Sequence, residues 1–211
     1  MILKQGIDVS HHQGKIDWKK VKESGKVDFA MIRAGYYSTL DDQFLANVYG
    51  CVKNEIDFGV YWYSYSYGVK EAGIEANACW NAIKNLSFSY PVAFDFEEYA
   101  QLNLPLDKQI KIIDTFMKFI ESKRFFAVLY MPAFYMQRLL DYEANWLAQY
   151  DRWVAHINVS RPAFDGAYGM HQYSWEGRIP GIDTLVDLDT CYRDYPGIIT
   201  NAKLNNIRSV F

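Results

Sequence analysis

Short apolar runs alternate with longer amphipathic segments along most of this chain. Apolar runs of four to eight residues predict buried strands, and segments whose apolar residues recur every three to four positions predict helices. Their alternation is typical of β-α units around a mostly parallel sheet. We predict strands over residues 6–10, 29–34, 59–65, 91–97 and 126–130, and helices over residues 17–24, 42–54, 69–86, 107–123 and 134–147.

The segment 107–123 has the clearest helical period. Ile110, Ile113, Met117 and Ile120 fall on one stripe, and several lysines fall outside it. A stripe of this width predicts an amphipathic helix that buries one face against a core.

The last third of the chain departs from this pattern. Residues 152–157, 170–173 and 185–188 read as strands, but the segments between them contain no helix of useful length. The count of about eight strands and five helices favours closure into a barrel in which loops or hairpins join the last strands. We predict one α/β domain over residues 1–211, with a C-terminal tail from about residue 196.

Composition limits the classes of function. The chain has 211 residues, half of them hydrophobic, which fits one large domain. Its net charge of −3, with interspersed signs, argues against nucleic acid as a partner. Three widely spaced cysteines predict buried free thiols instead of disulfides or a zinc site. We also expect no export signal and no membrane span, because no suitable apolar stretch is present.

The run from Phe94 to Glu97 carries the strongest chemical signal. Side chains two apart in a strand point the same way, so Asp95 and Glu97 share one face and Phe94 and Phe96 the other. Two neighbouring acids in a buried strand raise the pKa of at least one of them, because burial and like charge both disfavour ionisation. On these residues alone, two exposed acids that cap a turn or face an arginine explain the pattern equally well.

Other polar residues are expected to join this pair. The working site of such a barrel lies at the carboxyl ends of its strands. Asp8 ends the first predicted strand and Asp187 the last, and these two strands are neighbours in a closed barrel, so we expect the four acids to meet. Further polar and aromatic residues at strand ends or in the following loop are candidates for binding a sugar: Tyr63, Tyr65, Tyr130, Gln172 and Trp175.

Clustered carboxylates with tyrosines and amides suit glycoside hydrolysis, in which one acid protonates the leaving oxygen and another stabilises or attacks the anomeric carbon. The same acids could hold Mg²⁺. We expect no metal, because neither a phosphate-binding glycine loop nor a catalytic lysine accompanies them. Nucleophilic serine catalysis is disfavoured because no Gly-x-Ser-x-Gly motif is present.

Four histidines are weaker candidates. We expect His11 to be a turn residue, and His12 fits a turn and a cavity lining equally well. His156 and His171 are expected to be packed or hydrogen-bonded residues.

An ordered set of motifs resembles the lysozymes of glycoside hydrolase family 25. Between Gly6 and about Tyr192 it includes Gly6-Ile7-Asp8-Val9-Ser10, Gln13-Gly14, Ile16-Asp17-Trp18, Phe29-Ala30-Met31-Ile32-Arg33-Ala34-Gly35, Gly59-Val60-Tyr61, Tyr63-Ser64-Tyr65, Pro91-Val92-Ala93-Phe94-Asp95-Phe96-Glu97, Trp153-Val154-Ala155, Gln172-Tyr173-Ser174, Gly181-Ile182 and Val186-Asp187-Leu188-Asp189. The resemblance implies a flattened, irregular TIM-like (β/α)5(β)3 barrel. It also implies cleavage, without a cofactor, of the β-1,4 bond between N-acetylmuramic acid and N-acetylglucosamine in bacterial peptidoglycan.

The resemblance also implies roles for the acids. Glu97 would be the general acid and later the base. Asp95 would be either the nucleophile or the group that orients the substrate's own 2-acetamido group. Asp8 and Asp187 would be supporting acids. Glu98 adds a third acid after the pair and is expected to point away from it.

We therefore expect a monomeric peptidoglycan hydrolase that acts on the bacterial cell wall, after secretion or after release during phage lysis. Two alternatives remain. One is a glycan-binding barrel without catalysis. The other is a chitin-type glycosidase, although the Asp-x-x-Asp-x-Asp-x-Glu spacing typical of that class is missing before Glu97, where only Asp95 is present.

Overall fold

A computed structural model describes residues 3–207 of the chain, and these residues form nine strands, seven α-helices and one 3-10 helix. The strands are β1 (Lys4–Val9), β2 (Phe29–Tyr36), β3 (Thr39–Leu40), β4 (Asp57–Tyr63), β5 (Val92–Asp95), β6 (Ala127–Pro132), β7 (Asp151–Ala155), β8 (Met170–Gly177) and β9 (Val186–Cys191). The helices are η1 (His11–Gln13), α1 (Trp18–Glu23), α2 (Phe44–Lys53), α3 (Val69–Ile83), α4 (Tyr99–Leu102), α5 (Leu106–Ser122), α6 (Ala133–Leu147) and α7 (Tyr195–Ala202).

Eight of these strands close into a barrel, as the sequence predicts. The sheet order is β1-β9-β8-β7-β6-β5-β4-β2-β3, and β1 also pairs with β2, which joins the two sides. The short β3 forms an antiparallel hairpin with β2 outside the closed ring. Neighbouring barrel strands from β1 through β8 are parallel, whereas β9 runs antiparallel to both β1 and β8. The prediction that loops or hairpins join the last strands allowed such a reversal but did not specify it.

Both faces of the strands are buried, in two separate clusters. On β2, Met31 packs in the interior of the barrel, and its neighbour Ile32 packs in the outer layer against the helices. Helix α5 lies in that outer layer, where Ile113, Phe116 and Ile120 of its apolar stripe are fully buried. The helix predicted over residues 107–123 is therefore observed within one residue at each end.

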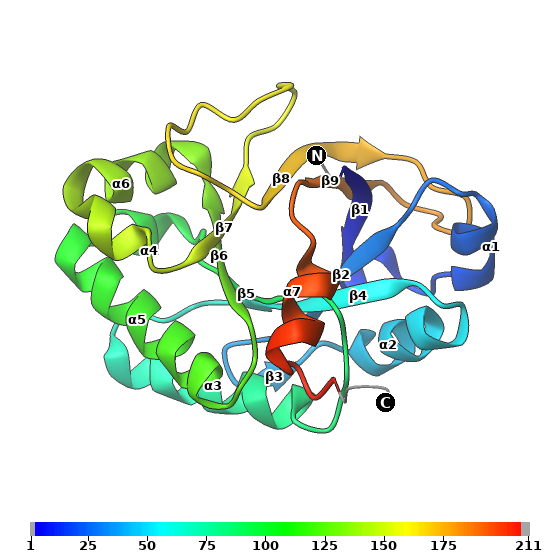
Figure 1. Cartoon of the computed structure of the whole chain (residues 1–211), viewed down its shortest axis with the longest axis horizontal. Helices are drawn as coiled ribbons and strands as arrows, with labels where there is room; N and C mark the ends of the chain where they lie inside the picture. Colours follow the sequence, from blue (N-terminus) through cyan, green and yellow to red (C-terminus); the bar gives the residue numbers. More distant parts are fainter. Residues whose placement is uncertain (1–2, 208–211) are drawn as a thin grey trace.

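Helix α7 closes the barrel at the end where the parallel strands begin. Figure 1 shows it in red at the centre of the sheet, whereas the other long helices lie around the outside. Tyr195 and Ile199 of α7 are buried in the interior cluster, and the Tyr195 hydroxyl donates to Asp151 Oδ2 at 2.9 Å. The segment from about residue 196, expected as a tail, thus contains an ordered helix, and residues 208–211 lie outside the described part. Proline in the first turn is a known start signal for helices, and Pro196 occupies that position.

Two predicted strands end earlier than the sequence pattern indicates. β4 ends at Tyr63 and β5 ends at Asp95, so Tyr65 and Glu97 lie in the following loops. The Ser64 amide still donates to the Asp95 carbonyl at 3.0 Å. The next amide, that of Tyr65, donates to the side chain of Glu75 at 2.8 Å instead of to a neighbouring strand.

Two negative findings concern the described residues. Among residues 3–207, no helix combines the length and the apolar character that crossing a membrane requires. The three cysteines, Cys51, Cys79 and Cys191, are free and buried, as predicted.

Candidate active site

A cavity of about 210 Å³ opens at the end of the barrel where the parallel strands finish. Its lining contains the four predicted acids and three of the predicted sugar-binding residues: Asp8, Asp95, Glu97 and Asp187, with Tyr63, Tyr130 and Gln172. The other residues that line it are Ser10, His12, Gln13, Arg33, Tyr61 and Trp153. The strand ends therefore bring together the acids that sequence reasoning grouped.

A second cavity, of about 510 Å³, adjoins the first and shares Glu97, Tyr130 and Gln172 with it. The exposed side chains of Phe134 and Trp175 line this second cavity.

Tyr65 lines neither cavity. Its ring lies against Tyr63 with the centroids 5.1 Å apart, which places it on the rim.

Strand β5 and the residues just after it orient Asp95 and Glu97 toward the cavity. Phe94 and Phe96 are fully buried in the outer cluster, and Phe94 stacks on Phe116 of α5 with the centroids 4.1 Å apart. Because side chains alternate along an extended chain, Asp95 faces the cavity instead. The Phe96 amide donates to the Tyr130 carbonyl at 3.1 Å, so the ladder continues one step past the strand and Glu97 also reaches the cavity.

Burial governs the protonation of this pair. Burial raises the pKa of Asp95 well above its usual range, and the neighbouring charge of Glu97 raises it further, while Arg33 opposes both effects. Burial raises the pKa of Glu97 to about 7, although a hydrogen bond with Tyr130 opposes the increase. Within the described residues, Asp95 Oδ1 has no hydrogen-bond partner. Near neutral pH the pair can therefore hold one proton and one negative charge, which is what acid-base catalysis at two carboxyl groups requires.

A second acidic group lies across the cavity. The antiparallel register pairs Asp8 with Asp187 and Gly6 with Asp189. Burial raises the pKa of Asp8 well above its usual range, that of Asp187 to about 6 and that of Asp189 to about 8. The prediction that Asp187 ends a parallel strand is wrong. β9 is antiparallel, so Asp187 lies near its start, and this reversal is what brings the side chain to the mouth.

Hydrogen bonds connect the two sides of the cavity. The Tyr130 hydroxyl donates to Gln172 Oε1, and Gln172 Nε2 donates to Asp8 Oδ2, both at 2.8 Å. Deeper in the barrel, Trp153 Nε1 donates to Asp189 Oδ1 at 2.8 Å. The amide of Gln172 thus fixes Asp8 relative to the residues around Glu97.

Glu98 was expected to point away from the pair, and it lines neither cavity. Its Oε1 accepts a hydrogen bond from the Tyr63 hydroxyl at 2.6 Å. Glu98 therefore holds a tyrosine that lines the cavity.

The histidines are all hydrogen-bonded or cavity-lining. His12 lines the cavity and His11 contacts Asp41. His171 Nε2 donates to the His156 carbonyl at 2.8 Å, and His156 Nδ1 accepts from the Ala163 amide at 3.0 Å. Over residues 3–207, no group of three or more His, Cys, Asp or Glu side chains is arranged to hold a metal ion.

Sequence reasoning missed several lining residues, of which Arg33 is the most informative. It lies two positions beyond Met31 on β2 and shares its inward register. A charged residue at an inward position of a buried strand needs a partner, and this was the signal available in the sequence. Ser10, Gln13 and Trp153 carry no comparable signal.

The raised pKa values predict how stability depends on pH. A carboxyl group whose pKa is higher in the folded chain binds more protons there, so stability falls as pH rises toward the folded pKa. We expect the free energy of unfolding to fall by an amount on the order of 1–3 kcal/mol between pH 6.5 and 8, the window in which Glu97 and Asp189 ionise. Urea denaturation followed by tryptophan fluorescence measures this directly.

Two controls belong to that experiment. Glu97→Gln should flatten the slope, because it removes one of the titrating groups, and Glu23→Gln on the exposed face of α1 should leave it unchanged. Stability that is constant or rises with pH over this window would contradict the assignment. Below pH 6.5 the lowered pKa values of His12 and His171 act in the opposite direction, so that range is not diagnostic.

Comparison with known proteins identifies the family. The family model for glycosyl hydrolases family 25 matches residues 7–182. The autolytic lysozyme of Clostridium acetobutylicum is 29% identical over 186 residues, which are 88% of this chain and 55% of that protein. The bacterial lysozyme of Streptomyces coelicolor superposes with a TM-score of 0.81 at 27% identity, covering 96% of this chain and 97% of that one.

A further solved relative carries a ligand. The modular autolysin LytC of Streptococcus pneumoniae, in complex with a synthetic peptidoglycan ligand, superposes with a TM-score of 0.75 at 27% identity. The match covers 90% of this chain and 47% of LytC. The chain thus spans about half the length of the autolytic lysozyme and of LytC. Because the family model covers most of its length, the chain belongs to glycosyl hydrolases family 25.

Proposed function

We propose that this chain hydrolyses the β-1,4 bond between N-acetylmuramic acid and N-acetylglucosamine in bacterial peptidoglycan. The observation that carries the proposal is the pair Asp95 and Glu97, two buried acids in one cavity with Asp8 and Asp187. Membership of a glycosyl hydrolase family supports it, as do relatives named lysozymes and an autolysin solved with a peptidoglycan ligand.

Glu97 would act first as the acid. With its pKa raised to about 7, it is largely protonated below neutral pH and can donate this proton to the glycosidic oxygen as the bond breaks. In the second step it would take a proton from the attacking water. Asp95 would either attack the anomeric carbon or orient the 2-acetamido group for that attack, and in both roles it must be ionised.

The glycan would cross both cavities. Glu97 lies where they meet, so the bond to be broken would lie there, with one sugar in the acidic cavity and the next beside Phe134 and Trp175. An exposed aromatic ring that lines a cavity offers a flat apolar surface to the face of a sugar ring.

Replacing Trp175 with alanine should weaken substrate binding and leave the chemical step intact. We expect KM for soluble glycan fragments to rise about tenfold, equivalent to about 1.4 kcal/mol of lost contact, with kcat changed less than threefold. Steady-state kinetics on purified glycan fragments measures both constants. Tyr99→Ala is the matched control, because Tyr99 is also an exposed aromatic residue and lines neither cavity. A fall in kcat at unchanged KM would remove Trp175 from substrate binding.

A digest of purified peptidoglycan tests the function itself. Hydrolysis at the proposed bond creates fragments with new reducing N-acetylmuramic acid ends, which mass spectrometry identifies. A glycan-binding barrel without catalysis would show saturable binding and no fragments. A chitin-type glycosidase would instead cleave N-acetylglucosamine oligosaccharides, which are included as a second substrate.

The remaining features of the proposal concern the domain, the oligomeric state and the cofactor. We propose that residues 1–211 form one catalytic domain that acts as a monomer, without a cofactor, on glycan strands of the bacterial cell wall.

A further inference from the structure

Arg33 introduces a positive charge into an acidic cavity. The residue is 8% exposed, and among the described residues that line the cavity it is the single lysine or arginine. Four carboxyl groups line the same space. A buried cation in this position is bound to influence which of these groups ionises.

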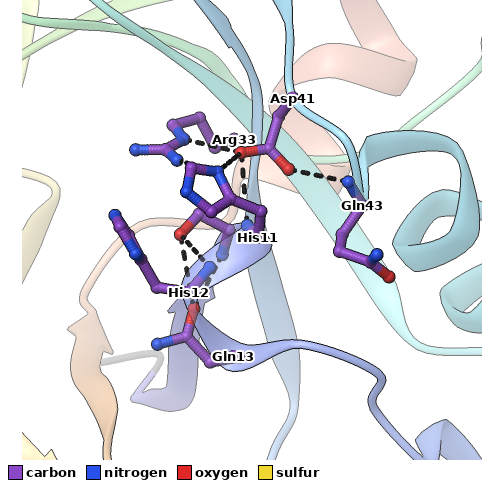
Figure 2. A network of polar contacts seen from close by, with 7 residues as sticks. His11, His12, Gln13, Arg33, Asp41 and Gln43 are labelled. Atoms are coloured by element: carbon purple, nitrogen blue, oxygen red, sulfur yellow. Dashed lines mark hydrogen bonds and ion pairs between the residues drawn. The ribbon is translucent and has the colours of Figure 1, made fainter.

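Asp41 holds the guanidinium group in place. Asp41 Oδ2 accepts from Arg33 Nε at 2.8 Å, and the other oxygen accepts from the Gln43 amide at 3.0 Å (Figure 2). Burial alone would raise the pKa of Asp41, but the hydrogen bonds from Arg33, Gln43 and His11 lower it below its usual value. Asp41 is therefore ionised and fixes one edge of the guanidinium group.

Further contacts restrict Arg33. The His11 amide donates to Asp41 Oδ2 at 3.2 Å, and the His11 ring lies against the Arg33 terminus in Figure 2. The ring of Tyr36 lies 5.5 Å from Arg33 Cζ. An arginine held in this way loses little additional freedom when it acts on a neighbouring group.

The cation acts unequally on the two central acids. The charged groups that shift the pKa of Asp95 are Glu97, Glu98 and Arg33, and among them only Arg33 lowers it and so favours the ionised form. The neighbours that shift the pKa of Glu97 are Tyr130, Asp187 and Glu98, and Arg33 is not among them. The strand order explains the difference, because β2 reaches β5 across one strand, β4, whereas Glu97 is held beside Tyr130 of β6.

We propose that Arg33, positioned by Asp41, assigns the negative charge of the carboxyl pair to Asp95 and thereby leaves the proton on Glu97. This inference rests on the proposed function, in which Asp95 must be ionised and Glu97 must be protonated. Without the cation, the more deeply buried Asp95 would keep the proton, and Glu97 would be left ionised and unable to act as the acid. Arg33 is thus a positioning residue for charge and needs no contact with the sugar.

Other titratable groups also lie around Asp95 and Arg33. Around Asp95 these are Glu97, Glu98 and the tyrosines Tyr61, Tyr63, Tyr65 and Tyr130. Around Arg33 they are Asp41, His11, His12, Tyr36, Tyr61 and Tyr65. The tyrosines are neutral over the acidic range and add no change of charge there.

The pH dependence of kcat/KM tests the inference. We expect Arg33→Gln to move the acidic limb of the profile, which reports ionisation of Asp95, upward by about 1 pH unit or more. Arg33→Lys keeps the charge and should move that limb much less. Arg193→Gln is the matched control, because Arg193 also pairs with a buried aspartate, Asp151, but lies at the opposite end of the barrel. A uniform loss of rate in Arg33→Gln, with the acidic limb unmoved, would overturn the proposal.

A second measurement does not depend on activity. In carboxyl-labelled wild-type protein, carbon NMR should show that Asp95 ionises at lower pH than Glu97, with Asp95→Asn and Glu97→Gln used to assign the signals. In Arg33→Gln the Asp95 signal should titrate at higher pH. If Glu97 ionises first in the wild-type protein, the proposal is wrong. Failure to cleave peptidoglycan while this order holds would instead count against the proposed function alone.

Discussion

Glu97→Gln should abolish hydrolysis of peptidoglycan while the barrel remains folded. Glutamine has the same shape but cannot donate a proton to the leaving oxygen, and loss of a general acid lowers rates by about 10²- to 10⁴-fold. The fold should tolerate the change, because Glu97 lies in a loop beyond β5 and the neutral amide removes a charge that burial disfavours. Release of reducing ends measures the rate, and thermal melting followed by circular dichroism measures the fold.

Glu98→Gln provides the matched comparison. It removes the adjacent acid, which lines neither cavity and accepts a hydrogen bond from Tyr63. We expect this variant to retain most of the activity. If Glu97→Gln kept more than a tenth of the wild-type rate, Glu97 would not be the general acid.

Asp95→Asn should also lower the rate by orders of magnitude, for a different reason. An amide carries no charge, so it can neither attack the anomeric carbon nor stabilise the positive charge that develops there. The loss should appear in kcat more than in KM, since the charge acts in the transition state. Asp8→Asn should be milder, because Asp8 is separated from the pair by Gln172 and Tyr130. Equal losses in the two variants would mean that Asp95 has no special role.

Local patterns predicted the features that depend on neighbours in sequence. The stripe of α5 and the alternation from Phe94 to Glu97 each follow from a fixed geometric period, and both are observed. The grouping of Asp8 with the central pair could also be predicted, because parallel strands end at the same end of a barrel.

Features set by distant partners could not be obtained in this way. The direction of β9 depends on its pairing with β1 and β8, and no local signal specifies it. In the sequence, Arg33 is a single polar residue in an apolar run. Its partner Asp41 follows the β2–β3 hairpin, and only the folded structure shows that the two side chains are in contact. Tyr65 lies outside its predicted strand, because its amide donates a hydrogen bond to Glu75 of α3.

The pairing of β1 with β9 has a consequence for biosynthesis. β1 leaves the ribosome before the other described strands, but one of its two edges stays open until β9 has been translated. Joining ends that are so far apart along the chain adds loop-closure entropy and slows folding. During that interval an unpaired edge is available to other nascent chains, so chaperone supply and growth temperature should govern the yield of recombinant protein.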